Sequence, residues 1–279
     1  MAELLFKKSH SVSLGINMPK TKRELLKAYE WANFEQFSTD QQQGLPRPDI
    51  QKPVPPGAQL IDLVPPDQFT IGDSSVVDVI RQRKSHRYFK PDAMNLEELS
   101  FLLWATQGMR DKSIEGGLTY LWRNVPSGGN RHPMETYLSI HNVDGIEAGL
   151  YRYLPIEHKL VQERLDPDIP EMVNQGSRDQ NSGTNQEPYY FIKEAAVVFI
   201  WTALPYRSEW RYHRAAAKLT ALDAGHICQN LYIAAGAIGC GTCAVGAYDQ
   251  AKMNSLVEVD GEDEFVIYMA PVGKLPDKK

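Results

Sequence analysis

A proline-rich stretch divides the chain into two parts. Seven of the 21 residues from Pro46 to Pro66 are proline. Each proline fixes φ and removes an amide donor, so this stretch is expected to be extended and stiff. We therefore predict an N-terminal helix and proline-rich arm over residues 1–66, and one large domain over residues 67–279. The arm either wraps a partner subunit or serves as a plain spacer, since proline-rich segments do both.

The first 45 residues carry few signals. The spacing of Leu25, Leu26 and Tyr29 predicts a helix from Thr21 to Phe37. Residues 1–19 contain two lysines and no apolar stretch of secretory type, so no signal peptide is expected there. No run approaches the roughly 18 apolar residues of a membrane span. Three cysteines do not make a disulfide framework, which favours a reducing, cytoplasmic setting.

The remainder alternates between helical and strand patterns, which predicts an α+β domain with an antiparallel component. Helices are expected at Leu96–Met109 and Leu219–Ala237, strands at Thr136–His141, Ala195–Trp201 and Phe265–Pro271, and a short hairpin at Gly149–Tyr153 and Lys159–Val161. Hydrophobic residues make up 42% of the chain, enough for a sizeable core. A net charge of −5 argues against general nucleic-acid binding, which needs excess basic residues.

A basic cluster follows a predicted helix that begins near Ser74 or Ser75. It reads Arg83-Lys84-Ser85-His86-Arg87, with Pro91 as a stop signal. Guanidinium forks, an ammonium and a hydroxyl together suit a phosphomonoester. The alternative is that these cations only interact favourably with the helix dipole at its C-terminus.

A second segment, Asn124 to Pro133, is a polar loop before a predicted strand. Its glycines let a flat ligand approach the backbone, and Ser127 and Asn130 can hydrogen-bond hydroxyls or ring heteroatoms. An ordinary surface turn has the same composition.

A third segment, Ala237 to Ala247, follows the long predicted helix and is rich in small residues. Small residues leave main-chain N–H groups accessible, as a ring gripped by backbone requires. A further loop, Gln175 to Pro188, is rich in polar residues, and we expect it to be mobile and to lie over the site.

These segments, in this order, resemble the flavin-dependent nitroreductase family, and most of all its SagB-type dehydrogenases, which oxidise azolines in ribosomal peptides. The resemblance covers about Ile61 to Lys274. It rests on Arg-x-Ser-x-Arg, Pro-Ser-x-Gly-Asn-x-x-Pro, the stretch Asp223-x-Gly-His-x-x-Gln-Asn230, and the closing Pro-Val-Gly-Lys. It implies a nitroreductase-like fold with a mainly antiparallel central sheet flanked by helices, in an intertwined homodimer.

The resemblance also implies FMN as the cofactor, bound at the subunit interface, with NAD(P)H or the substrate as reductant. Arg83, Lys84, Ser85 and Arg87 would hold the phosphate and ribityl chain, and Lys274 would close the phosphate site. Lys84 stands where relatives often carry arginine, so the charge is kept and the fork is lost.

In the same way, Pro126, Ser127, Gly128 and Asn130 would line one side of the flavin. The residues from Cys243 to Ala247, Val245 included, would face its ring, with a backbone N–H of Gly246 or Ala247 near N5. The sequence singles out no catalytic side chain and no metal site.

Two polar motifs have structural explanations that we favour. Cys240-Gly-Thr-Cys243 lacks the βαβ setting of a redox dithiol and a second ligand pair for zinc, so the cysteines are expected to fill space near the flavin. Asp223, His226 and Asn230 share one helix face and are expected to satisfy each other or a partner subunit, rather than to act as acid and base. His86 and His132 are expected to be local hydrogen-bonding residues.

The predicted function is therefore an FMN-dependent oxidoreductase that transfers a hydride through flavin N5. The first alternative is an azoline dehydrogenase acting on a ribosomal peptide. The second is a flavin-binding or scaffold protein without turnover.

Overall fold

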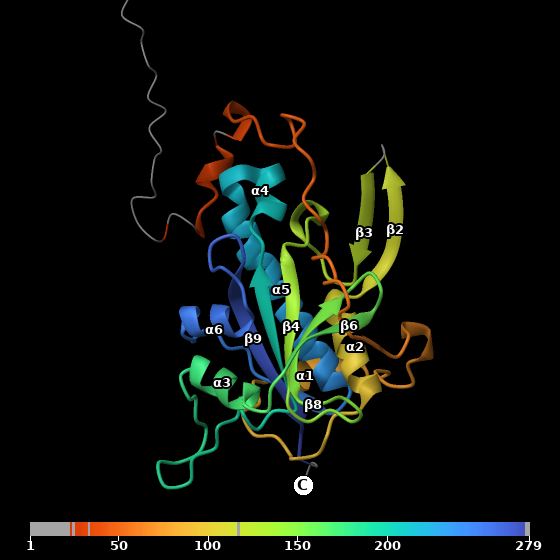
Figure 1. The fold of residues 1–279 in the computed structure, drawn as a ribbon, viewed down its shortest axis with the longest axis vertical. Coiled ribbons are helices and arrows are strands. Elements are labelled where there is room, and N and C mark those ends of the chain that lie inside the picture. The colour runs from red at the N-terminus through yellow and green to blue at the C-terminus, as the bar shows by residue number, and fades with distance from the viewer. Residues whose placement is uncertain (1–22, 24–25, 33, 116–117, 277–279) are drawn as a thin grey trace, which may run out of the picture.

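An antiparallel sheet forms the centre of the protein (Figure 1). The computed structural model describes residues 23, 26–32, 34–115 and 118–276, and within them the main sheet has the strand order β1-β6-β5-β4-β7-β9-β8. All its strand pairs are antiparallel, which confirms the predicted α+β class. Its strands are β1 (Leu60–Asp62), β4 (Met134–Ile140), β5 (Gly149–Leu154), β6 (Lys159–Leu165), β7 (Val197–Ala203), β8 (Cys240–Thr242) and β9 (Phe265–Lys274).

A two-stranded ribbon stands apart from the body of the molecule (Figure 1). It pairs β2 (Met109–Glu115) with β3 (Leu118–Arg123). The sequence did not predict this ribbon, and the expected helix at Leu96–Met109 ends two residues earlier, at Gln107, where the ribbon begins.

Helices cover both faces of the main sheet (Figure 1). On one face lie α1 (Val76–Gln82), α2 (Leu96–Gln107) and the long α5 (Ala216–Ala237), and on the other lie α3 (Ile169–Gly176) and α6 (Gln250–Leu256). The short α4 (Tyr206–Tyr212) leads into α5. Short 3-10 turns occupy Tyr29–Trp31, Phe34–Gln36, Pro66–Gln68, Gly128–Asn130 and His213–Ala215.

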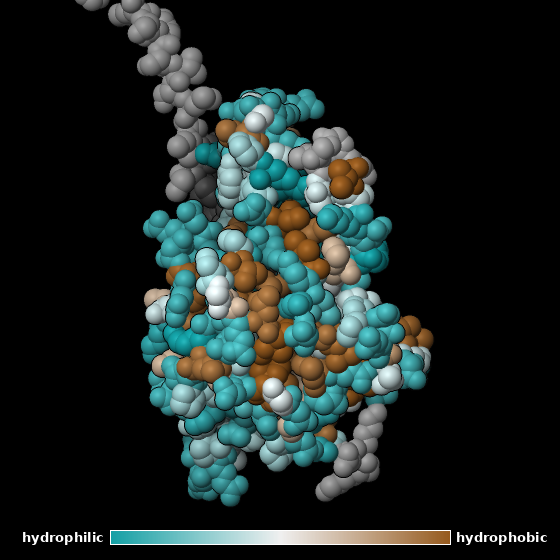
Figure 2. All heavy atoms as spheres, turned by 45° about the vertical axis from the view of Figure 1, so that its right-hand side comes forward, coloured by the Kyte–Doolittle hydropathy of each residue, from teal (hydrophilic) through white to brown (hydrophobic). Residues whose placement is uncertain are grey.

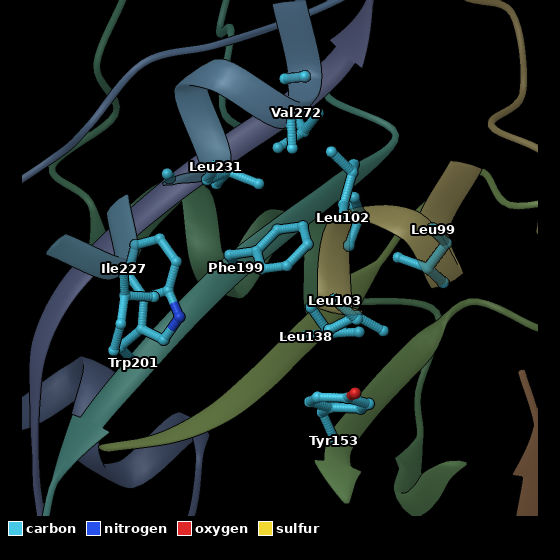
Figure 3. Packing of buried hydrophobic residues seen from close by; sticks show 14 of the residues in the cluster. Leu99, Leu102, Leu103, Leu138, Tyr153, Phe199, Trp201, Ile227, Leu231 and Val272 are labelled. Carbon is cyan, nitrogen blue, oxygen red and sulfur yellow. The ribbon is translucent and has the colours of Figure 1, made fainter. Parts of the chain in front are cut away.

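Strand β7 shows why both faces of the sheet are covered by helices. All seven of its residues are buried, and alternate side chains enter different clusters. Phe199 and Trp201 pack with α2 and α5, while Val198 and Ile200 pack on the α3 and α6 side. Figure 3 shows the first cluster, where leucines of α2 and Ile227 and Leu231 of α5 close on Phe199 and Trp201. A continuous apolar run can be a central strand only when both faces are covered.

The prediction of a helix from Thr21 to Phe37 is wrong for the described residues of that range. They form two 3-10 turns, Tyr29–Trp31 and Phe34–Gln36, and Leu26 and Tyr29 are exposed. Apolar spacing predicts a helix only when the apolar face is buried, and here it is not. Residues 1–22, including the range examined for a signal peptide, lie outside the described residues.

The proline-rich stretch lies along its own domain. Arg152, which is 2% exposed, donates hydrogen bonds to the carbonyl oxygens of Lys52 (3.2 Å) and Pro53 (3.0 Å). The Lys52 ammonium pairs with Glu264 at 2.6 Å. Strand β1, also inside the predicted arm, pairs with β6 at the edge of the sheet. The stretch is thus fastened to the sheet of the same chain.

Across the described ranges, none of the helices combines the length and apolar character needed to cross a bilayer.

Candidate functional site

The basic cluster directly follows α1, as predicted, and it is tied to α5 and to the third segment. Neither Ser74 nor Ser75 caps α1 through its side chain; the Ser74 hydroxyl instead donates to the carbonyl of Ala237. The Arg83 guanidinium lies over the ring of Tyr232, 5.2 Å from its centroid. The Ser85 and Tyr232 hydroxyls are hydrogen-bonded at 2.9 Å.

Tyr232 joins the first segment to the third, and the sequence did not single it out. Its hydroxyl bonds Ser85 and also accepts the backbone N–H of Ala244 at 2.8 Å. The backbone N–H of His86 donates to the carbonyl of Thr242 at 2.9 Å. Two segments that are separated by about 150 residues therefore meet around one phenol.

The glycines of these segments permit their close approach. A Cβ added at Gly241 would lie 2.8 Å from Cβ of His86, and one added at Gly273 would lie 2.7 Å from the Phe89 ring. Both contacts are shorter than any real Cβ makes, so a side chain at either glycine would push the basic cluster away from β8 and β9.

A groove of about 960 Å³ opens between α1, the C-terminal end of α5 and β8. Arg83, Lys84 and His86 line it, and the one carboxylate among its described lining residues, Asp78, is paired with Arg81 at 3.1 Å. Burial, then Lys84 and Arg83, lower the pKa of His86, so its ring is neutral at pH 7. The groove therefore presents two cations to a ligand, which is the chemistry a phosphate needs.

The other residues predicted for the phosphate lie around this groove rather than in its lining. Ser85 and Arg87 lie against the Cys243 thiol; burial raises the pKa of that thiol, and the Arg87 charge and hydrogen bonds from both residues oppose the shift. The Lys274 ammonium forms an ion pair with Glu98. Glu98 also accepts the N–H of Asn95 in the capping box that begins α2, so Lys274 is held at the start of that helix.

The third segment buries two of its side chains and exposes the two residues that follow them. Cys243 and Val245 are buried in the α3 and α6 core, whereas Gly246 and Ala247 are exposed. In the described part of the chain, neither the Gly246 nor the Ala247 N–H donates to another residue. Gln180, from the polar loop predicted to cover the site, donates to the carbonyl of Ala247 at 2.9 Å.

The second segment is held by one buried carboxylate. Asp223 of α5 accepts the Ser127 hydroxyl at 2.5 Å and the Gly128 N–H at 3.2 Å. Burial raises the pKa of Asp223, and these hydrogen bonds oppose the shift. Gly129, Asn130 and His132 all have φ between +47° and +58°, so the loop is strained and needs this support.

The other two polar residues of that helix face also have structural partners. Asn230 donates to the carbonyl of Ala105 at 2.9 Å, and His226 lies 3.9 Å from Asp223. The three cysteines are buried free thiols, and burial raises the pKa of Cys228 and of Cys240 to about 12. These findings favour the structural explanations over acid–base or dithiol roles.

The second segment does not meet the other two within one chain. It lies at the N-terminal part of α5, next to Asp223, whereas the groove lies near Tyr232. Nine residues of helix separate the two, which is about 13 Å along the axis. Pro126, Ser127 and Asn130 line a different cavity, of about 620 Å³, and Gly128 lies beside it.

Sequence comparison decides the family. The profile described as "Nitroreductase family" matches residues 80–274, which contain all three segments and Lys274. The chain belongs to the nitroreductase family. The resemblance predicted from the four motifs is thereby confirmed, and membership of this family supports an oxidoreductase.

Two relatives of this nitroreductase family member illustrate its range. A protein of Methanocaldococcus jannaschii named as a nitroreductase is 29% identical over 204 residues, 73% of this chain and 93% of the relative. The trifolitoxin-processing protein TfxB of Rhizobium leguminosarum bv. trifolii is 26% identical over 208 residues, 74% of this chain. The chain spans only 53% of the length of TfxB.

Solved structures share the fold. A nitroreductase structure from Anabaena variabilis superposes with a TM-score of 0.64 at 20% identity, covering 86% of this chain and 43% of that one. The Escherichia coli microcin synthetase McbBCD, solved with truncated pro-MccB17, gives a TM-score of 0.53 at 16% identity, covering 92% and 95%. TfxB is named for trifolitoxin processing, which fits the SagB-type resemblance, and the McbBCD structure is named as a microcin synthetase.

Proposed function

We propose that this family member is an FMN-dependent oxidoreductase that works as a homodimer. The contacts of Tyr232 carry the proposal: its hydroxyl fixes Ser85 of the basic cluster and Ala244 of the small-residue segment around one groove. A cationic pocket next to exposed backbone N–H groups that donate no hydrogen bond is suited to a phosphate joined to a flat ring.

The residues present fit this cofactor. Arg83 and Lys84 would bind the phosphate, while the N–H groups of Gly246 and Ala247 are free to donate to a ring nitrogen. Lys274 would reach the phosphate only by leaving Glu98, so we assign it a smaller part. FMN, when bound, supplies a ring that takes up and releases two electrons as a hydride equivalent.

The homodimer explains why the predicted flavin residues lie in two places. If the flavin lies at the subunit interface, the groove of one subunit and the Ser127–Asn130 loop of its partner complete one site. Exposed apolar residues on α1 and α5 offer an interface: Val76, Val77 and Ile80 are 56–61% exposed, and Leu222 is 49% exposed. Figure 2 shows hydrophobic residues gathered in a band on one side of the molecule, as interaction surfaces require.

The first test is the visible spectrum of the purified protein before and after anaerobic addition of NADPH, with the released cofactor identified by mass. Flavin absorbance that bleaches supports an FMN oxidoreductase. Absorbance that neither nicotinamide nor a candidate substrate can bleach supports the binding or scaffold alternative. If no flavin binds even after reconstitution, the proposal is wrong.

The variant Arg83→Gln tests the groove itself. It should weaken FMN binding about tenfold, because hydrogen bonds to charged groups contribute about 1.5–3 kcal/mol. Lys252→Gln is the control, because Lys252 is exposed on α6 and absent from the groove lining. Equal losses in both variants would point to general charge rather than to a phosphate site.

A second function is favoured by the relatives that process peptides. We propose azoline oxidation in a ribosomal peptide as the alternative reaction, with the peptide as reductant of the flavin in place of NAD(P)H. Anaerobic bleaching by an azoline-containing peptide, but not by NADPH, would favour this alternative. Bleaching by NADPH alone would favour the first.

A further inference from the structure

The second cavity, beside the Ser127–Asn130 loop, has walls from three parts of the chain. The β2–β3 ribbon, which stands out from the body in Figure 1, supplies Tyr120 and Trp122, and α4 supplies Arg211. This cavity is distinct from the groove near Tyr232, and the proposed phosphate site does not use it.

The lining is cationic. Arg110, Arg123 and Arg211 come from β2, β3 and α4, and no aspartate or glutamate is among the described residues that line the cavity. Two further arginines lie close behind the lining. Arg47 is 5.0 Å from the centroid of the Tyr120 ring, and Arg131 is 4.9 Å from that of Trp210.

The nearby carboxylates are already committed. Glu135 pairs with Arg207 at 2.5 Å and accepts the Lys52 N–H. Asp223 is occupied by Ser127 and Gly128. The described lining itself therefore carries no acidic partner for its arginines. Burial lowers the pKa of Arg123 to about 10, against the attraction of Glu135, and burial also lowers the pKa of Arg131 to about 10.

The cavity also holds hydrogen-bond donors that have no acceptor. Nε of Arg123 and Nδ2 of Asn130 are buried and have no partner among the described residues, whereas the other two Arg123 nitrogens donate to the Gln107 side chain and the Ile50 carbonyl. The Asn130 amide oxygen is taken by His132 at 2.7 Å, and burial, then Arg123 and the neighbouring arginines, hold the pKa of His132 well below its usual range. His132 is thus neutral and donates, so the Asn130 amide is left as a donor toward the cavity.

We propose that this cavity binds the carboxylate of a flat, conjugated substrate. An acceptor-only group satisfies the donors, guanidinium forks match a planar carboxylate, and Tyr120 and Trp122 offer ring faces for the rest of the molecule. The inference rests on the proposed function, because the Ser127–Asn130 loop would place this ligand next to the flavin. It adds the substrate class to that proposal.

The test is calorimetric binding of three probes of one shape: 4-nitrobenzoate, 4-nitrobenzamide and 4-nitrophenyl phosphate. The full chain is used, both with and without FMN. We expect 4-nitrobenzoate to bind at least about tenfold more tightly than the amide, because the amide carries no charge and replaces one acceptor oxygen by an NH2 donor. Equal binding of acid and amide overturns the inference, and tighter binding of the phosphate overturns the carboxylate assignment.

Variants make the assignment specific. Arg211→Gln should weaken binding of 4-nitrobenzoate about tenfold and leave the amide unchanged. Arg214→Gln is the matched control, because Arg214 is exposed and outside the lining. Equal effects of the two variants would overturn the inference. Trp122→Ala should weaken the acid and the amide alike, because it removes a ring face and no charge.

The two proposals fail separately. A protein that binds no flavin but still prefers 4-nitrobenzoate, with that preference lost in Arg211→Gln, contradicts the proposed function and supports the anion site. A protein whose flavin is reduced but which does not distinguish acid from amide does the reverse.

Discussion

The regions near the two ends of α5 are built differently. Near Tyr232 the site consists of exposed cations and exposed backbone, and glycines allow the segments to meet. Near Asp223 a strained loop is fixed by a buried carboxylate and surrounded by arginines. The first end can admit a ligand at little structural cost, whereas the second end is part of the stability of the fold. Variants at the two ends should therefore differ in whether they change binding or folding.

The largest effect is expected from Asp223→Ala. It leaves the Ser127 hydroxyl and the Gly128 N–H without their acceptor, and should lower the free energy of unfolding by about 3 kcal/mol. Asp78→Ala, at the other end, removes an exposed pair with Arg81 and should cost less than about 0.5 kcal/mol. Urea unfolding measures both, and similar losses would refute the contrast.

The effect of low pH on stability should also differ between the two ends of α5. The folded-state pKa of His132 is lowered, by burial first and by its arginine neighbours, so the unfolded chain binds a proton that the folded chain excludes. Stability is then present above about pH 6.5 and is lost as the pH falls, by at most about 1.4 kcal/mol per pH unit.

The measurement is urea unfolding of the wild type and two variants at pH 7 and pH 5. His132→Asn should reduce the loss of stability between these pH values by about 2 kcal/mol. His86→Asn should change it much less, because His86 is only partly buried and its pKa is lowered less. Unchanged pH dependence in His132→Asn would show that the pKa of His132 is the same in the folded and the unfolded chain.

Valine substitutions at two glycines test the packing of the third segment. Gly241→Val should cost about 1–3 kcal/mol, because its Cβ would overlap His86 and Leu275. At Gly246 the nearest atom to a new Cβ is 4.0 Å away, so Gly246→Val should leave the free energy of unfolding almost unchanged. It should nonetheless weaken FMN binding by blocking close approach to the backbone. Thermal unfolding and flavin titration distinguish the two outcomes.

Local patterns in the sequence predicted the parts of the molecule that depend on local physics. The apolar period of α5 and the unbroken apolar run of β7 gave those elements to within three residues of their observed ends. The basic cluster was found because its charges are adjacent in sequence. The β2–β3 ribbon was missed because its strands are partly charged and Ile114 is exposed, so no burial pattern marks them.

Long-range pairings lay beyond the sequence. Nothing local indicates that Lys274 pairs with Glu98, 176 residues earlier, or that Asp223 holds a loop 96 residues away. The arginines of the second cavity come from three elements whose arrangement only the fold reveals. The sequence therefore predicted the candidate segments, and the structure supplied the residues that connect them.

A modest loss of stability, in the variant most informative about the groove, is expected from Tyr232→Phe. It removes one hydroxyl that bonds Ser85 and Ala244, which should cost about 1 kcal/mol of stability. That hydroxyl positions the basic cluster against the small-residue segment. The loss in free energy of FMN binding should therefore exceed the loss in free energy of unfolding. Ser85→Ala is the partner variant, and the double variant should bind FMN no more weakly than Tyr232→Phe alone. Additive losses would mean that Ser85 and Tyr232 act independently, and that their contact does not shape the groove.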